Sequence, residues 1–179
     1  MRRRDSTHTL CRNMLLHRKS MQRYIFLDFD GVICTQQHRQ TLLEKHQPLK
    51  DDLGPYFDPE AVANLRAIID ATDAGIVVTS SWKYKGLSTL QALWTCRNMP
   101  GTLLDVTPIV MAGYLFNRGM EINQWLYSNT QSDPDTCRYV ILDDALDFLP
   151  EQRPYLINTN PDCGLTAQDA AQAISILTT

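Results

Sequence analysis

Two aspartates stand one residue apart at the end of the first apolar run in this chain. Residues 24–27 are typical of a buried strand, and Asp28 and Asp30 follow directly, before Gly31. On an extended strand both carboxylates would point the same way, and their repulsion favours a cation or a shared proton between them. A polar turn is the plain alternative. An EF-hand calcium loop is disfavoured, because residues 32–34 offer no side-chain oxygen ligand.

Two later apolar runs also end in polar side chains. Residues 76–78 lead into Thr79-Ser80, and residues 139–142 lead into Asp143-Asp144. If these strands are parallel, their carboxyl ends lie at one edge of the sheet, where open α/β sheets bind ligands. The sequence therefore predicts that the three polar strand ends meet.

The elements needed to position them alternate between strands and helices, which predicts a mainly parallel sheet with helices on both faces. We expect helices near 40–46, from the Asp58-Pro59 cap to Gly75, over 87–94, after 117–119 and over 166–177. Further strands are expected at 76–78, 139–142 and 155–157. The connecting loops are expected over 33–57, around the short helix, through Asp105 and Pro108, and over 128–137.

The order of these strand ends resembles the haloacid dehalogenase (HAD) superfamily of phosphatases and phosphotransferases. Its four motifs are matched by Asp28-Phe29-Asp30-Gly31, by Thr79-Ser80 after a strand, by Arg118 at a helix start, and by Asp143-Asp144 after a strand. The resemblance covers about residues 23–160. The segments Thr-Ser-Ser-Trp-Lys at 79–83 and Arg-Gly-x-Glu-Ile at 118–122 are also similar to small HAD domains associated with RNA-repair proteins.

This resemblance implies a three-layer, Rossmann-like HAD domain over residues 23–179 with a minimal cap or none. Asp28 would be the nucleophile that forms an aspartyl-phosphate, and Asp30 would protonate the leaving oxygen and later accept a proton from water. Thr79 would hydrogen-bond the phosphoryl group together with the Ser80 backbone N–H, although either residue fits the second motif. Arg118 would neutralise the remaining charge.

The resemblance also implies a magnesium ion. Its expected ligands are Asp28, the main-chain carbonyl of Asp30, and Asp143, with Asp144 as a further ligand or as a residue that orients Asp143.

Other interpretations of the basic residues stay open. Arg118 could be an exposed residue paired with Glu121, and Lys83 and Lys85 are rivals for the third-motif role. Trp82 is expected to pack in the core, close enough to the site to stack on a substrate.

The charge is unevenly distributed along the chain. Residues 1–23 carry a net charge of +6 and the rest −9. We expect residues 1–22 to be a basic, disordered leader or sequence upstream of a start at Met21. A nucleic-acid-binding arm and an organelle-targeting segment are the alternatives.

The five cysteines are scattered and include no Cys-x-x-Cys pair, which argues for a reducing compartment and against a zinc site. No apolar stretch approaches the ~20 residues that span a membrane. We therefore expect a cytoplasmic protein with no membrane contact and no obligate protein partner.

These patterns predict a magnesium-dependent phosphomonoesterase whose substrate is a phosphorylated small molecule or a nucleic-acid end. A non-catalytic phosphate-binding or interaction module on the same fold is the main alternative. A dehalogenase is a third, disfavoured because attack on a carbon–halogen bond needs no acid at Asp30.

Overall fold

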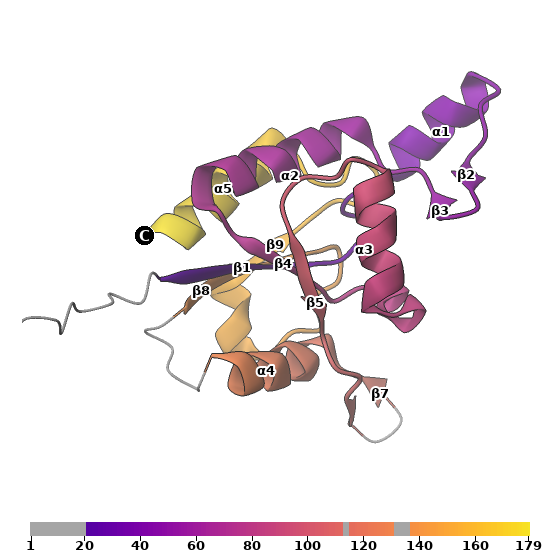
Figure 1. The fold of residues 1–179 in the computed structure, drawn as a ribbon. Coiled ribbons are helices and arrows are strands. Elements are labelled where there is room, and N and C mark those ends of the chain that lie inside the picture. The colour runs from indigo at the N-terminus through magenta and orange to yellow at the C-terminus, as the bar shows by residue number, and fades with distance from the viewer. Residues whose placement is uncertain (1–20, 113–114, 131–136) are drawn as a thin grey trace, which may run out of the picture.

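The computed structural model describes residues 21–112, 115–130 and 137–179. The expected leader thus lies almost wholly outside the described residues. Five parallel strands form the central sheet in the order β5-β4-β1-β8-β9 (Figure 1). Their bounds are β1 (Gln22–Leu27), β4 (Gly75–Val78), β5 (Leu103–Val106), β8 (Cys137–Asp143) and β9 (Leu156–Asn158). The predicted α/β class is confirmed.

Helices cover both faces of this sheet. Helices α2 (Pro59–Thr72) and α5 (Ala167–Thr178) lie on one face and α4 (Arg118–Asn129) on the other, while α3 (Leu87–Cys96) packs with α2 in the larger core (Figure 1). The middle strands are buried on both sides, so residues 25–27, 76–78 and 140–142 are fully buried. Beneath α4 the core is smaller and aromatic, with the ring of Trp125 edge-on to Tyr24 at 5.0 Å.

The ends of α2 show what local sequence decides and what it leaves open. Asp58 caps the helix by accepting a hydrogen bond from the Glu60 N–H at 2.9 Å, as the sequence predicts. The predicted end at Gly75 is wrong. The helix stops at Thr72, and Asp73 reverses the chain with φ of 53°, a conformation that aspartate tolerates better than most residues.

Two small insertions stand at the carboxyl side of the sheet. The first holds α1 (Gln36–Glu44), which starts earlier than the expected 40–46 because Thr35 caps it, and the pair β2 (Lys50–Asp51) and β3 (Gly54–Pro55). The second holds the pair β6 (Met111–Ala112) and β7 (Leu115–Phe116). Neither forms a cap domain, as predicted.

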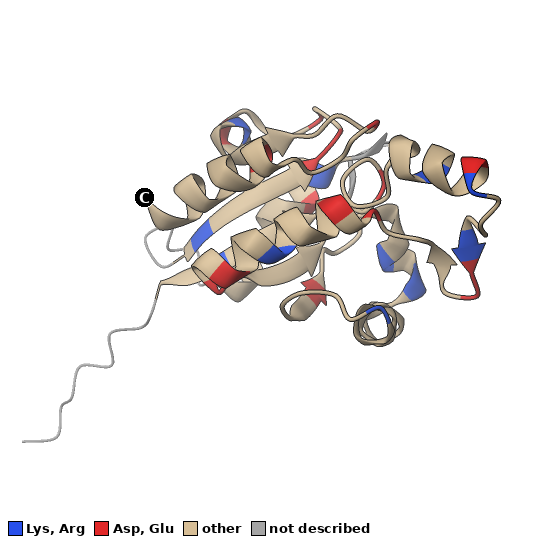
Figure 2. Ribbon diagram, turned by 90° about the horizontal axis from the view of Figure 1, so that it is seen from above, with Lys and Arg blue, Asp and Glu red and all other residues tan. Residues whose placement is uncertain are grey.

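Part of the chain expected as a loop is a strand. Strand β5 pairs with β4 at the sheet edge and includes Asp105, which we expected in a loop. The described residues also include the short 3-10 helices η1 (Ser81–Lys85) and η3 (Pro150–Tyr155). Because η3 extends to Tyr155, the strand expected at 155–157 begins one residue later. Lys and Arg alternate with Asp and Glu along the outer elements, for example over α2 and over α1 to β2 (Figure 2).

Candidate active site

Three neighbouring strands end level with one another. Leu27 of β1 is in register with the end of β4 and with the last leucine of β8. The residues that follow are Asp28, Thr79 and Asp143. Backbone hydrogen bonds lock this edge, from Asp28 N to the Leu142 carbonyl at 3.0 Å and from Thr79 N to the Leu27 carbonyl at 2.9 Å. The strand order reverses at β1, which is where open α/β sheets form a crevice for ligands.

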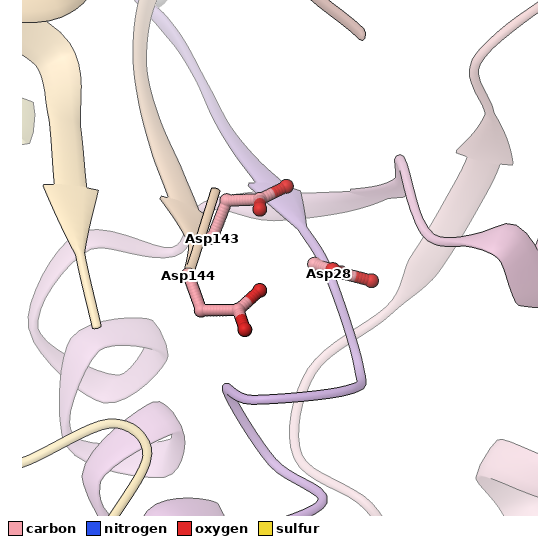
Figure 3. A group of neighbouring side chains, drawn as sticks. All are labelled: Asp28, Asp143 and Asp144. Atoms are coloured by element: carbon pink, nitrogen blue, oxygen red, sulfur yellow. The ribbon is translucent and has the colours of Figure 1, made fainter. Parts of the chain in front are cut away.

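Three carboxylates converge at this edge. Asp28 extends from the end of β1 and Asp143 and Asp144 from the end of β8, each offering an oxygen within 4.8 Å of the others (Figure 3). Asp28 and Asp143 are buried. The backbone at Gly31, with φ of 75°, lies so close that a methyl group there would sit 2.5 Å from the Asp144 carboxyl carbon. The chain thus needs glycine after Asp30 to bring the two loops together.

Arg118 lies against two of these acids. Its Nη1 donates to Asp28 Oδ2 at 2.6 Å and also to Asp143 Oδ2. The residue is the first of α4, whose cap Asn117 accepts from Met120 N at 2.9 Å. Burial opposes the charged guanidinium, but Asp143 and Asp28 outweigh it and raise the pKa of Arg118.

Even with Arg118 beside it, the ionised form of Asp143 is disfavoured. Burial, followed by the charge of Asp28, raises the pKa of Asp143 to about 6, against the opposing effect of Arg118. Three carboxylates facing one guanidinium leave an excess of negative charge. A hard divalent cation with oxygen ligands suits such a cluster.

The hydroxyls after β4 differ in what they bind. Thr79 Oγ1 is buried and has no hydrogen-bond partner among the described residues, whereas Ser80 Oγ accepts from Trp82 N at 3.3 Å and caps η1. An unsatisfied buried hydroxyl costs about 1–3 kcal/mol. The Thr79 hydroxyl is therefore the one available to a ligand.

Asp30 is exposed beside the cluster, and its oxygen Oδ2 accepts a hydrogen bond from Trp82 Nε1 at 3.1 Å. Its side chain is outside the group of three carboxylates able to share a metal. Burial raises the pKa of Asp30, and the indole hydrogen bond works in the opposite direction. Trp82 is buried against Phe29, with the ring centroids 5.3 Å apart, as expected for a packing residue, and its indole N–H orients Asp30.

The rival basic residues have other partners. Lys83 is buried and forms an ion pair with Glu121, so that Glu121 is not the partner of Arg118. Lys85 lies 4.2 Å over the Trp82 ring and donates to the Leu53 carbonyl at 3.4 Å. Of the three candidates, the structure brings Arg118 to the carboxylates.

The first insertion borders the site through Trp82. The backbone of Gly54 lies so close that a methyl group there would be 2.9 Å from the indole ring. Arg97 of α3 fastens this hairpin, donating to Asp51 Oδ1 at 2.8 Å, to the Gly54 carbonyl at 2.9 Å and to the Pro55 carbonyl. The β2–β3 hairpin is thus held beside the site by its hydrogen bonds to Arg97.

Sequence reasoning missed the contacts that hold the motifs rather than the motifs themselves. The bonds from Trp82 to Asp30 and from Lys83 to Glu121 join positions 52 and 38 residues apart. A local signal exists only in the placement of Trp82 and Lys83 directly after the second motif.

Within the described residues, no helix is long and apolar enough to cross a membrane. The comparisons with curated proteins and with solved structures gave no match. A family model described as the HAD domain in Swiss Army Knife RNA repair proteins matches residues 24–170. That span runs from β1 into α5 and includes every strand end of the site. The chain therefore belongs to this family of HAD domains.

Proposed function

We propose that this protein is a magnesium-dependent phosphomonoesterase that acts through an aspartyl-phosphate on Asp28. The observation that carries the proposal is the carboxylate cluster, two of whose three acids are buried, beside both Arg118 and the unpartnered Thr79 hydroxyl. An anion-binding hydroxyl and guanidinium next to an excess of carboxylates is the combination that phosphoryl transfer requires.

In the first step a carboxylate oxygen of Asp28 attacks phosphorus, and the bond from phosphorus to the leaving oxygen breaks as Asp30 donates it a proton. In the second step water attacks phosphorus and Asp30 takes its proton, while the bond from phosphorus to the Asp28 oxygen breaks, which releases inorganic phosphate and restores the Asp28 carboxylate. Thr79 and the Ser80 backbone N–H hold the phosphoryl oxygens in both steps. Arg118 stays beside Asp28 and neutralises the phosphoryl charge.

The donor set fits magnesium. Asp28, Asp143 and Asp144 are hard oxygen ligands within reach of one ion, and the Asp30 main-chain carbonyl is the further ligand that we assign. Bound magnesium would supply the positive charge that lets an anionic nucleophile approach an anionic phosphate.

We propose a nucleic-acid end as the substrate class. The insertions around the site are too small to form a cap domain, which favours large substrates. The matched family is described from RNA repair proteins. The mixed charges of α1, β2 and α2 (Figure 2) favour recognition through the terminal phosphate over a long electrostatic contact with the backbone.

We also assign the protein to the cytoplasm. The thiols of Cys34, Cys96 and Cys163 are not joined in disulfides, which supports a reducing compartment.

The test is hydrolysis of p-nitrophenyl phosphate with and without magnesium by the wild-type protein, Asp28→Asn and Asp30→Asn. We expect magnesium-dependent turnover that EDTA abolishes and that both variants lose. A second assay compares oligonucleotides bearing 3′- or 5′-phosphates with nucleotides and sugar phosphates.

Turnover that survives in Asp28→Asn would contradict the aspartyl-phosphate. No turnover on either panel by a folded, magnesium-binding protein would favour a phosphate-binding module instead. Preference for small phosphates over oligonucleotides would overturn the proposed substrate class alone.

A further inference from the structure

A second charged cluster lies next to the site and is almost completely enclosed. Lys83 and Glu121 form a salt bridge whose side chains are 5% and 2% exposed. The Lys83 amine also donates to Thr107 Oγ1 at 3.3 Å and lies 3.5 Å from the Pro108 carbonyl. Glu121 Oε1 accepts from Val110 N at 3.4 Å. Both charges are therefore neutralised and hydrogen-bonded inside the protein.

A gain in folding stability does not explain why this ion pair is buried. Replacing a buried ion pair with apolar residues of similar volume is often neutral or stabilising. A buried pair holds its two elements in the arrangement in which the charges meet, because separating them would leave both charges uncompensated. The elements that this pair joins therefore decide what it is for.

The pair joins the phosphate-binding turn to the helix that carries the arginine. Lys83 lies in η1, four residues after Thr79, and Glu121 lies in α4, three residues after Arg118. Residues three apart on a helix share one side, so fixing Glu121 fixes the rotation of α4 at Arg118. On its other side, α4 is held by buried Gln152, whose Nε2 donates to the Gly119 carbonyl at 2.8 Å.

We infer that Lys83 and Glu121 are positioning residues that set where the Arg118 guanidinium stands relative to Asp28 and Thr79. This inference rests on the proposed function. It assigns no substrate contact to Lys83, because the amine is already bound to Glu121, Thr107 and Pro108. The pair fixes the helix that carries Arg118 relative to the turn that carries Thr79.

Glu121→Gln tests this with the least disturbance, since it keeps the side-chain length and one amide oxygen. We expect kcat to fall roughly 10-fold, because small displacements of a positioned group are costly. In an Arg118→Ala background the same change should cost less than about 2-fold, because no guanidinium is left to misplace. Lys83→Met should behave in the same way. Leu177→Ala, a buried change at the far end of α5, controls for general destabilisation and should leave kcat unchanged.

A readout that needs no turnover accompanies the kinetics. In protein labelled with nitrogen-15, the Arg118 Nε–H signal is assigned by its loss in Arg118→Ala. We expect it to shift or broaden in Glu121→Gln and to stay in place in Leu177→Ala.

An unmoved Arg118 signal in Glu121→Gln would overturn the inference. An equal loss of kcat from Glu121→Gln with and without Arg118 would also overturn it, because the pair would then act independently of Arg118. If wild-type protein shows no turnover, the proposed function fails, and the Arg118 signal still decides whether the pair positions it.

Discussion

Two charged clusters lie side by side in this protein, one enclosed and one partly open to solvent, and their charges are arranged differently. Around Lys83 and Glu121 the charges balance one to one, and the side chains are almost completely enclosed. Around Arg118 three carboxylates face one guanidinium, and the Arg118 side chain is 26% exposed. One cluster is complete, and the other requires a cation and can be reached from solvent.

The difference separates a structural joint from a reaction site. A closed, neutral cluster holds the helices that it joins in place. An open cluster with excess negative charge can bind a ligand that supplies positive charge. The sequence alone does not distinguish them, since each combines a basic residue after a strand or loop with acids elsewhere. Changes to each cluster should therefore affect different measurements.

The largest effect is expected from Asp28→Asn. It removes the nucleophile, so turnover should fall by more than about 10⁴-fold, while stability should hold or rise because repulsion with Asp143 is relieved. Steady-state kinetics and thermal unfolding measure both. Loss of folding in place of activity would mean that the open cluster is structural as well.

In the closed cluster the expected pattern is reversed. Lys83→Met leaves the Glu121 carboxylate buried without its cation, which should reduce the free energy of unfolding by about 3–5 kcal/mol. Urea unfolding measures it, with the exposed change Lys45→Met as a matched control that should alter stability by less than about 0.5 kcal/mol. A cost as small as that of the control would show that the pair is not effectively buried in solution.

The raised pKa of Asp143 predicts a pH dependence of stability in metal-free protein. Its value of about 6 lies above the ordinary 3.8, so the folded state keeps a proton that the unfolded state releases. The stabilisation is complete below pH 4 and is lost as the pH rises through 6, amounting to about 3 kcal/mol. Urea unfolding in EDTA between pH 4 and 7 should show this decline in wild type and a smaller one in Asp143→Asn. Identical slopes would contradict it.

The smallest effect is expected at the hydrogen bond between Trp82 and Asp30. Trp82→Phe keeps an aromatic ring against Phe29 but removes the N–H, so the pKa of Asp30 should rise further and kcat should fall about 5-fold. The basic limb of the kcat/KM profile, where Asp30 loses the proton that it donates in the first step, should move to higher pH. A uniform loss of rate at all pH values would point to packing instead.

Most of the fold follows from sequence because its central strands are unambiguous. Runs such as residues 76–78 and 139–142 are short, apolar and rich in β-branched residues, and polar residues follow them, which favours a buried strand over a helix. Strand β5 was missed because it lies at the edge, with Leu104 45% exposed and Asp105 paired to Trp125 by tertiary structure at 2.7 Å. That bond joins positions 20 residues apart, beyond any local pattern.

The structure brings Asp28, Asp143, Asp144 and Arg118 together at the strand ends, whereas the roles of all the predicted site residues stay predictions. The strand ends were predictable because parallel strands bring them to one edge. The choice of Arg118 over Lys83 was not, since it depends on which of the two cations pairs with Glu121, a contact that requires α4 to pack beside η1. The status of the Thr79 and Ser80 hydroxyls likewise emerges only from their surroundings.

The position of β1 in the middle of the sheet also has a consequence for biosynthesis. β1 is synthesised before β4 and β5, and its other partner, β8, begins only at Cys137, after both of them. Until then one side of β1, whose residues 24–27 are apolar, has no neighbour, and unpaired strand edges favour association with other chains. A nascent chain that stalls before residue 137 would therefore be prone to aggregation and would lack Asp143, so the emergence of β8 completes both the sheet and the carboxylate cluster.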